Sequence, residues 1–269
     1  MKVAICMRGA IGKVGTWGQR FSLKNSLYDN DREYVDYVKC YNSIHRHIIT
    51  PNINDYEIDF FLQCWNTDLE DKLCQLYKPK KHSFENNQIY NTEIESLCRE
   101  ECDFGGISQA LAIQKTIQLK ESYEAENMFN YDIVIVYRYD VLIWKDLCLS
   151  TYEFNDHTIY VNGHPGCNAD FHFIMKNNLS FYFKFLYNSI RHGNFHKTHS
   201  WISNYVVNYM KIDIKCDEIW AGKFQEVLRV IQEYSIDPGH LTIQQLESYN
   251  YIIPEKNDSP TLLRDSVDM

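Results

Sequence analysis

The sequence lacks any long apolar run, and this absence excludes one large class of proteins. No stretch approaches the roughly 20 consecutive apolar residues that a membrane-spanning helix needs, so we expect no membrane span. The first residues, MKVAICMRG, have too short an apolar core for a signal peptide and lack its small-residue cleavage site. They predict a first β-strand instead.

Positive charge and closely spaced cysteine pairs are also scarce. The net charge of -9 argues against a nucleic-acid partner, because binding to a phosphate backbone needs a basic surface. The nine cysteines are scattered along the chain without a CxxC pair. Their odd number, together with the lack of a signal peptide, is typical of reduced thiols. We therefore expect a cytoplasmic protein.

The most informative stretch that is present covers residues 131–146, with the sequence YDIVIVYRYDVLIWKD. The β-branched run Ile133–Val136 predicts a central strand that is buried on both faces, as in the sheet of an α/β domain. Arg138 and Asp140 follow where this strand surfaces, and buried charges are costly unless they have partners. Ligands of open α/β sheets bind at the carboxyl ends of strands. We therefore expect the functional site here.

The rest of the chain alternates between strand-like and helix-like segments. The expected strands cover residues 2–7, 57–64, 133–136, 158–161, 171–175 and 212–215. The expected helices cover residues from about 31 to 48, 67–76, 108–125, 179–189 and 200–210. With 45% hydrophobic residues in 269, the chain can bury a substantial core. This order predicts an α/β fold with a mostly parallel central sheet flanked by helices.

A glycine-rich segment with two cations follows the first expected strand. Arg8 comes directly after the strand, Lys13 lies five residues further on, and the glycines recur every third residue at Gly9, Gly12, Gly15 and Gly18. Glycines at this place let backbone N–H groups approach a phosphate closely. Arg8, Gly9, Gly12 and Lys13 are therefore candidates for binding a phosphate of a nucleotide ligand, and a simple flexible turn is the alternative.

Four further polar or aromatic residues are candidates for ligand contacts. Ser108 and Gln109 stand at the expected start of a helix, whose positive end favours anions, although Ser108 could simply be the N-cap. Trp65 follows a strand, where an acceptor sugar could stack on its ring, or it packs in the core. His164, in the loop GHPG, could border the cleft in which an acceptor binds, or it lies on the surface.

Four segments, in this order, resemble the nucleotide-sugar-dependent glycosyltransferases of the GT-A type. They are MKVAICMRG, IDFFLQCWNTD, ISQALAIQKTIQLKESYE and YDIVIVYRYDVL. The chain is most similar to small enzymes that build capsule-like or viral surface glycans, and the resemblance covers roughly residues 1–215. It implies one GT-A-like, Rossmann-like catalytic domain over residues 1–254, with a donor-binding half to about 146, an acceptor half from about 147, and a flexible tail at 255–269.

The resemblance also implies a substrate and a compartment. The donor would be a nucleoside-diphosphate sugar, with uridine diphosphate (UDP) favoured. The acceptor would be a hydroxyl of a glycan or glycoprotein, and the transferred group a hexose or pentose. A viral enzyme of this kind would work in the host cytoplasm.

In that family the central strand ends in a D-x-D motif, whose carboxylates hold Mn²⁺ or Mg²⁺ against the donor diphosphate. Here the motif stands as Arg138-Tyr139-Asp140, so only the second acid is matched. Asp140 could still hold an ion, with His199 as a late second ligand, because phosphates and waters complete its octahedron. Alternatively, Arg138 replaces the ion as a bidentate phosphate clamp. A structural salt bridge between Arg138 and Asp140 is the third possibility.

The catalytic mechanism depends on stereochemistry, which leaves the role of Asp170 open. An inverting transfer needs a carboxylate to remove the proton of the acceptor hydroxyl. Asp170 is the candidate base, because it closes a loop of small residues just before a strand. A turn-forming aspartate is the alternative, and a retaining enzyme needs no such base.

Two other functions compete with glycosyl transfer. The segment RGAIGKVG resembles the glycine turn of NAD(P)-dependent short-chain reductases, which also need a helical Tyr-x-x-x-Lys pair. Tyr77 and Lys81 have that spacing, but Pro79 between them interrupts a helix. A non-catalytic sugar-binding domain is the third hypothesis, since it would keep Trp65 and the tyrosines without needing Asp140.

Overall fold

The computed structural model describes most of the first 217 residues and a few beyond them. The described residues are 1–13, 33–99, 103–164, 167–193, 203–217, 219 and 225–227. The predicted tail at 255–269 and the predicted metal ligand His199 lie outside them.

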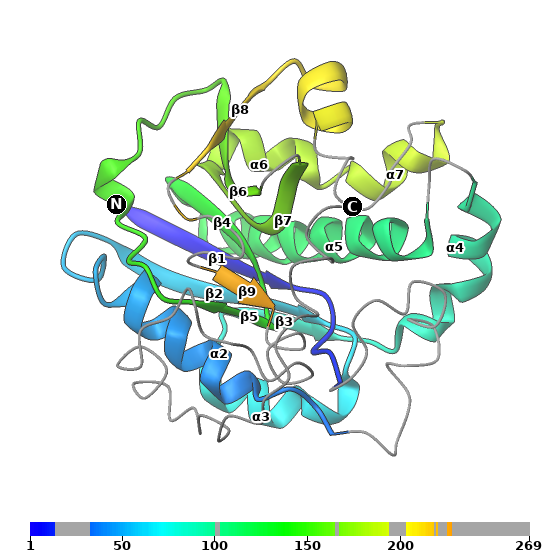
Figure 1. The fold of residues 1–269 in the computed structure, drawn as a ribbon, viewed down its shortest axis with the longest axis horizontal. Helices are drawn as coiled ribbons and strands as arrows, with labels where there is room; N and C mark the ends of the chain where they lie inside the picture. Colours follow the sequence, from blue (N-terminus) through cyan, green and yellow to red (C-terminus); the bar gives the residue numbers. More distant parts are fainter. Residues whose placement is uncertain are drawn as a thin grey trace, which may run out of the picture.

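A seven-stranded sheet forms the centre of the molecule (Figure 1). Its spatial order is β3-β2-β1-β4-β7-β6-β8. The strands are β1 (Lys2–Arg8), β2 (Glu57–Cys64), β3 (Lys81–Phe84), β4 (Ile133–Arg138), β6 (Thr158–His164), β7 (Cys167–Lys176) and β8 (Asp213–Cys216). Only β7 runs against its neighbours, so the sheet is mostly parallel, as predicted. The sheet combines strands from both predicted halves of the chain.

Helices cover both faces of this sheet (Figure 1). One face carries α2 (Tyr37–Ile44) and α3 (Glu70–Tyr77). The other carries α4 (Asn91–Leu97), α5 (Phe104–Asn127), α6 (Asn177–Phe183) and α7 (Leu186–Arg191). Short helical segments are η1 (His45–Ile49), η2 (Thr67–Leu69), η3 (Asn87–Tyr90), η4 (Leu149–Thr151) and η5 (Ser203–Tyr209). A small second sheet pairs β5 (Val141–Ile143) with β9 (Gln225–Val227).

The central strand β4 is buried on both faces, which confirms the prediction from its β-branched run. Ile133 and Ile135 pack in the core beneath α2 and α3. Val134 and Val136 pack in the core beneath α5. Because successive side chains of a strand point to opposite faces, Arg138 falls on the α5 side. The same alternation along β1 places Arg8 on that side too.

The strand order reverses between β1 and β4. From β1 the chain builds outward through β2 and β3, and it then returns to place β4 on the other side of β1. In open α/β sheets ligands bind outside the carboxyl ends of the strands at such a switch point. Arg8 and Arg138 are the last residues of these two strands, and they are direct partners in the parallel register.

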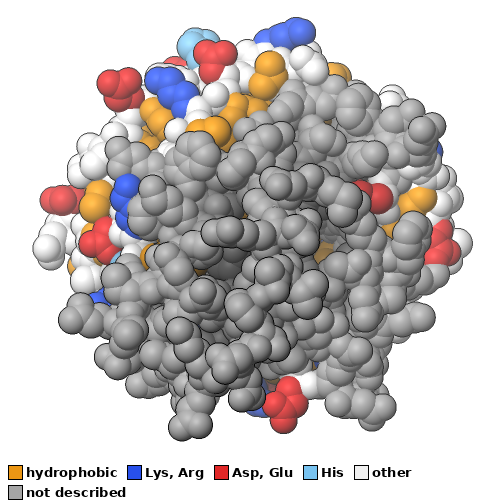
Figure 2. Space-filling view, in the orientation of Figure 1, with side chains coloured by type: hydrophobic (Ala, Val, Ile, Leu, Met, Phe, Trp, Pro, Cys, Tyr) orange, Lys and Arg blue, Asp and Glu red, His pale blue; other side chains and the backbone are white. Residues whose placement is uncertain are grey.

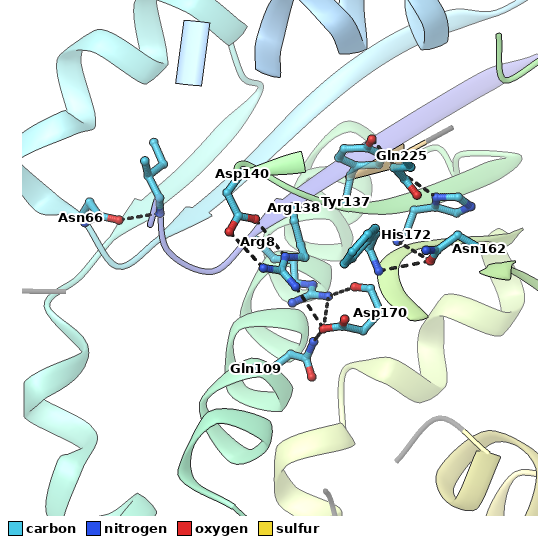
Figure 3. A network of polar contacts seen from close by, with 12 residues as sticks. Arg8, Asn66, Gln109, Tyr137, Arg138, Asp140, Asn162, Asp170, His172 and Gln225 are labelled. Atoms are coloured by element: carbon cyan, nitrogen blue, oxygen red, sulfur yellow. Dashed lines mark hydrogen bonds and ion pairs between the residues drawn. The ribbon is translucent and has the colours of Figure 1, made fainter. Parts of the chain in front are cut away.

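Helix α5 begins four residues earlier than predicted. Its N-cap is Asp103, whose carboxylate accepts a hydrogen bond of 2.5 Å from the backbone N–H of Gly106. The N-capping role considered for Ser108 is therefore wrong. Ser108 and Gln109 lie one turn inside the helix, where Gln109 faces the carboxyl ends of the strands (Figure 3).

The described helices include no candidate membrane span, and the face in view shows no separation of charge among its described side chains. No helix in the described ranges is both long and apolar enough to cross a membrane. On the face shown in Figure 2, the described acidic and basic side chains are interspersed among apolar and uncharged ones.

Candidate functional site

Two arginines lie side by side at the switch point of the sheet. Arg8 ends β1 and Arg138 ends β4, and both side chains are on the α5 side (Figure 3). The Arg8 guanidinium carbon lies 5.9 Å from the centre of the Phe173 ring, and that of Arg138 lies 5.5 Å from the Phe171 ring. Arg8 is only 4% exposed. Arg138 is partly buried. Cations on neighbouring strand ends need nearby anions, because their repulsion is strong in a poorly solvated site.

Asp170 supplies the first of these anions. Its Oδ2 lies 3.4 Å from Arg138 Nη1 and 3.7 Å from Arg8 Nη2. The same oxygen accepts a hydrogen bond from Gln109 Nε2. The backbone carbonyl of Asp170 accepts a second bond, of 2.5 Å, from Arg8 Nη2. Donors from β1, β4 and α5 therefore converge on one carboxylate oxygen (Figure 3).

Asp140 supplies the second anion, in a different geometry. Arg138 Nε donates to Asp140 Oδ1 at 2.9 Å, and Arg138 Nη2 donates to Oδ2 at 3.0 Å. This fork is the strongest arrangement of an arginine with a carboxylate, and it fixes the plane of the guanidinium. The predicted contact between Arg138 and Asp140 is thus present in the structure, as a partly buried bidentate pair.

The positive charges of Arg8 and Arg138 are balanced by the negative charges of Asp140 and Asp170, but the hydrogen bonds of the cluster are not all satisfied. Burial is the main cause that lowers the pKa of Arg8 to about 10; the charge of Asp170 opposes the change, and the neighbouring Arg138 adds to it. Arg8 thus stays protonated at neutral pH. Its buried Nε finds no acceptor within the part of the chain that the structure describes. A guanidinium that is held in place at the switch point and has an unused N–H group can donate a hydrogen bond to an anionic oxygen, such as that of a phosphate.

The same donor set fits a divalent cation poorly. Both carboxylate oxygens of Asp140, the predicted metal ligand, accept hydrogen bonds from Arg138. Within the described residues no group of three or more His, Cys, Asp or Glu side chains is arranged to hold a metal ion. A cation here would also lie close to two guanidinium groups. The predicted Mn²⁺ or Mg²⁺ with Asp140 and His199 stays a prediction.

The glycine loop after β1 is pinned by residues that follow β2. Gly9, in the left-handed region with φ of +92°, donates its N–H to Gln63 Oε1 at 3.0 Å. Its carbonyl accepts from the N–H of Trp65 at 3.0 Å. The N–H of Ile11 donates to Asn66 Oδ1 at 2.8 Å. Two N–H groups of this loop are thus used inside the protein, which favours the turn interpretation of Gly9 over phosphate contact.

The remaining described part of the loop contacts an aromatic residue. The carbonyl of Gly12 accepts a hydrogen bond from the N–H of Val35 at 3.0 Å. Lys13 is buried, and its ammonium lies 4.9 Å from the centre of the Tyr34 ring. The hydroxyl of Tyr34 donates to the carboxylate of Asp68, and burial is the main cause that raises the pKa of Tyr34 to about 12. Lys13 is therefore another buried cation, in the segment that follows β1.

The two predicted acceptor residues, Trp65 and His164, and the predicted donor-binding residue Ser108 lie in three different parts of the fold. Trp65 is only 4% exposed, and its ring centre lies 5.9 Å from that of Tyr90, so the packing interpretation is favoured. His164 ends β6 opposite Cys167 in the β6–β7 hairpin, and its side chain lies outside the described part. Ser108 is buried next to Gln109 on α5.

A second polar network, which the sequence did not reveal, lies near the site. His172 Nε2 is 2.6 Å from Asp217 Oδ2, and His172 Nδ1 is 3.2 Å from Gln225 Nε2. Gln225 Nε2 also donates to the hydroxyl of Tyr137 at 2.7 Å. An amide nitrogen only donates, so Nδ1 of His172 accepts and its Nε2 carries the proton. Both ring nitrogens are engaged, which indicates a structural role in joining β9 to β4 and β7 (Figure 3).

The pair of residues that a short-chain reductase would need is not assembled. Helix α3 ends at Tyr77, and Lys78 follows in the left-handed region with φ of +48°. Lys81 then begins strand β3. Pro79 explains the break, as predicted, because it cannot continue the hydrogen bonding of a helix. Tyr77 and Lys81 therefore do not share a helix face.

Comparison with known proteins adds little to this geometry. No protein-family model matches the chain, and no curated protein matches it. One solved structure to which the chain is similar is described as the crystal structure of a glycosyltransferase involved in the glycosylation of the major capsid of PBCV-1. The match has a TM-score of 0.37 and 9% sequence identity, and it covers 64% of this chain and 96% of that chain. A likeness at this level decides neither the fold family nor the function.

Proposed function

We propose that this protein transfers a glycosyl group from a nucleoside-diphosphate sugar to a hydroxyl of a glycan or glycoprotein. One observation carries the proposal: Arg8 and Arg138 lie side by side at the switch point between β1 and β4, with Arg8 Nε buried and without an acceptor in the described residues. The order of the four sequence segments that resemble GT-A glycosyltransferases supports the choice of reaction. UDP as the nucleotide follows from the resemblance alone.

The arginines match the charge that this reaction develops. When the bond between the sugar and the diphosphate breaks, negative charge grows on the leaving phosphate, and fixed donors nearby stabilise the transition state. Two guanidinium groups held by Asp140, Asp170 and ring contacts need little reorganisation to do this. In this proposal Arg138, which stands where the family has its first acid, takes over the role of the metal ion.

The proposed binding place of the acceptor follows from where Asp170 and His164 lie in the fold. Asp170 and His164 both belong to the β6–β7 hairpin, whose strand β7 lies next to β4. An acceptor hydroxyl entering beside this hairpin would come close to the end of β4. For an inverting transfer Asp170 remains the candidate proton acceptor, and it would first have to leave the arginines.

Nucleotide binding, measured by thermal shift and by calorimetry, tests the proposal. The ligands are UDP, guanosine diphosphate and NADP⁺, each with Mn²⁺ and with a chelator. A ligand at about 100 times its dissociation constant stabilises a protein by about 2.7 kcal/mol, which such a screen detects readily. We expect a nucleoside diphosphate to bind equally well with the chelator. Dependence on Mn²⁺ would instead favour a metal held by Asp140 and His199.

Turnover gives the second half of this test. Release of nucleotide from a panel of nucleoside-diphosphate sugars, with and without added glycan acceptors, reports transfer directly. Binding of NADP⁺ with no response to any nucleoside diphosphate would move the assignment to a reductase. Binding of free sugars without nucleotide and without turnover would identify a sugar-binding domain.

A further inference from the structure

The carboxylate of Asp170 occupies a position that suits an oxygen of a bound anion. Its Oδ2 is met by Arg138 Nη1 at 3.4 Å and by Gln109 Nε2, and Arg8 Nη2 lies 3.7 Å away. These donors come from three separate elements, β4, α5 and β1, and they converge on this one atom (Figure 3). Asp170 itself is 4% exposed.

We propose that Asp170 is an internal counter-anion, which a phosphate group of the ligand displaces from the two arginines. This inference rests on the proposed function, because it takes a diphosphate as the ligand of Arg8 and Arg138. Until the ligand arrives, the Asp170 carboxylate neutralises two cations that would otherwise repel each other. The ligand then takes over its contacts, so that binding exchanges one anion for another.

The backbone around Asp170 is anchored in a way that leaves the side chain to move alone. The carbonyl of Asp170 is held by Arg8 Nη2 at 2.5 Å. The next two backbone N–H groups, of Phe171 and His172, donate to Asn162 Oδ1 at 3.2 and 3.4 Å. Strand β7 is therefore fixed at the carbonyl of Asp170 and at the two residues that follow it. A change of side-chain rotamer can therefore release the carboxylate without moving this part of the strand.

Asp140 makes a contrast within the same cluster. It binds Nε and Nη2 of Arg138 as a bidentate partner, which leaves Nη1 directed at Asp170. Because this fork sets the plane of the guanidinium, Asp140 positions Arg138 for the ligand. Asp170 and Asp140 carry the same charge and both touch Arg138, but only Asp170 stands where the ligand would bind. Substituting each of them by asparagine therefore distinguishes the effect of removing a negative charge from the effect of where that charge is located.

The test measures binding of inorganic pyrophosphate by calorimetry at fixed ionic strength. Asp170→Asn keeps the shape of the side chain and removes the competing charge, so we expect pyrophosphate to bind about tenfold more tightly than to the wild type. Asp140→Asn removes the same charge but loosens Arg138, so its affinity should be equal to the wild type or lower. Asp170→Ala provides a second variant, with the same expected direction, and circular dichroism checks that each variant is folded.

The outcomes separate this inference from the proposed function. Tighter binding by Asp170→Asn and Asp170→Ala alone supports the displacement. Equal tightening by Asp140→Asn would show that net charge is the cause and would overturn it. Weaker binding by both Asp170 variants would also overturn it, because Asp170 would then hold the arginines in place for the ligand. Absence of pyrophosphate binding in the wild type and in every variant would count against the proposed diphosphate site itself.

Discussion

Helix α5 contributes to two buried polar clusters that differ in how completely their hydrogen bonds are satisfied. Gln109, near its start, belongs to the arginine cluster at the carboxyl ends of the strands. Lys120, eleven residues further along and so about 16 Å away along the axis, belongs to a cluster near the start of β4. Both clusters join α5 to the sheet, and both contain buried ion pairs.

In the Lys120 cluster every donor has an acceptor. The Lys120 ammonium has three N–H groups, which reach Glu124 Oε2 at 2.9 Å, Ser180 Oγ at 3.2 Å and Asn177 Oδ1. Glu124 Oε1 accepts from the N–H of Tyr131 at 2.8 Å and from Asn177 Nδ2 at 2.9 Å. Lys120 is 1% exposed. A saturated network of this kind ties elements together and leaves nothing for a ligand.

The hydrogen bonds of the arginine cluster are satisfied less completely. Each guanidinium carries five N–H groups, and Arg8 Nε is buried without an acceptor among the described residues. Since a buried polar group without a partner is unfavourable, such a site is maintained at a cost to stability. The difference agrees with the proposed function, in which the arginine cluster binds the ligand and the Lys120 cluster only joins elements of the fold. Four predictions test this contrast, in order of expected size.

The largest effect should come from Lys120→Met. The substitution leaves Glu124 charged and buried without its cation, which typically costs about 3–5 kcal/mol of unfolding free energy. Urea denaturation followed by circular dichroism measures the loss. Adding Glu124→Gln should recover part of it, because the uncompensated charge is then gone. A loss below about 1 kcal/mol would mean that water or other groups replace Lys120, and the contrast would fail.

Arg138→Gln should act mainly on binding. Loss of a charged hydrogen-bond donor to a phosphate should weaken pyrophosphate binding by about 2–3 kcal/mol in calorimetry. Arg138→Lys keeps the charge but loses the fork, so an intermediate loss is expected. The double variant with Asp140→Asn controls for the carboxylate that Arg138 leaves behind. Wild-type affinity in Arg138→Gln would exclude Arg138 from the ligand site.

Gly9→Ala and Gly193→Ala form a matched pair. Both glycines have positive φ, +92° and +97°, and an added Cβ would meet nothing within 4 Å at either place. Each substitution should therefore lower stability by about 1–2 kcal/mol through backbone strain alone. Gly9 directly follows Arg8, so only Gly9→Ala should also weaken pyrophosphate binding. Equal binding by both variants would show that the turn at Gly9 does not position Arg8.

The smallest effect concerns alkaline pH. Burial lowers the pKa of Arg8 to about 10, so Arg8 loses its charge as the pH rises through that value. Pyrophosphate affinity in the wild type should then fall between pH 9 and pH 10.5. Arg8→Gln, which carries no charge at any pH, should bind more weakly throughout and lack this step. A step of the same size in Arg8→Gln would assign the titration to another group.

Local features of the sequence were sufficient to predict the central strand and the two charged residues of the candidate site that follow it. The run Ile133–Val136 predicted a strand buried on both faces, and Arg138 and Asp140 were expected at its end. These features are local, because β-branched residues and the two-residue period of a strand act within a few positions. The start of α5 is harder to predict, because Asp103 and Ser108 are both residue types that favour an N-cap, and the helix uses Asp103.

The partners of the arginines had no local signal. Asp170 is 162 residues from Arg8 and 32 from Arg138, and it was considered as a base or a turn residue. The apolar segment FHFIM around His172 does not predict that this histidine contacts Asp217 and Gln225, which lie 45 and 53 residues further along the chain. Antiparallel β7 brings Asp170 and His172 alongside the end of β4, and the direction of this strand has no signal in the local sequence.

By itself the sequence determined an α/β fold with a mostly parallel sheet, a buried central strand, and charged residues where that strand ends. Hydrophobic periodicity carries this information, since each pattern depends on neighbouring residues alone. Only the tertiary structure decided that Arg8 and Arg138 are register partners and that Asp170 and Gln109 meet between them. These contacts depend on strand order, strand direction and the register of whole elements, which result from burying the two faces of the sheet beneath α2, α3 and α5.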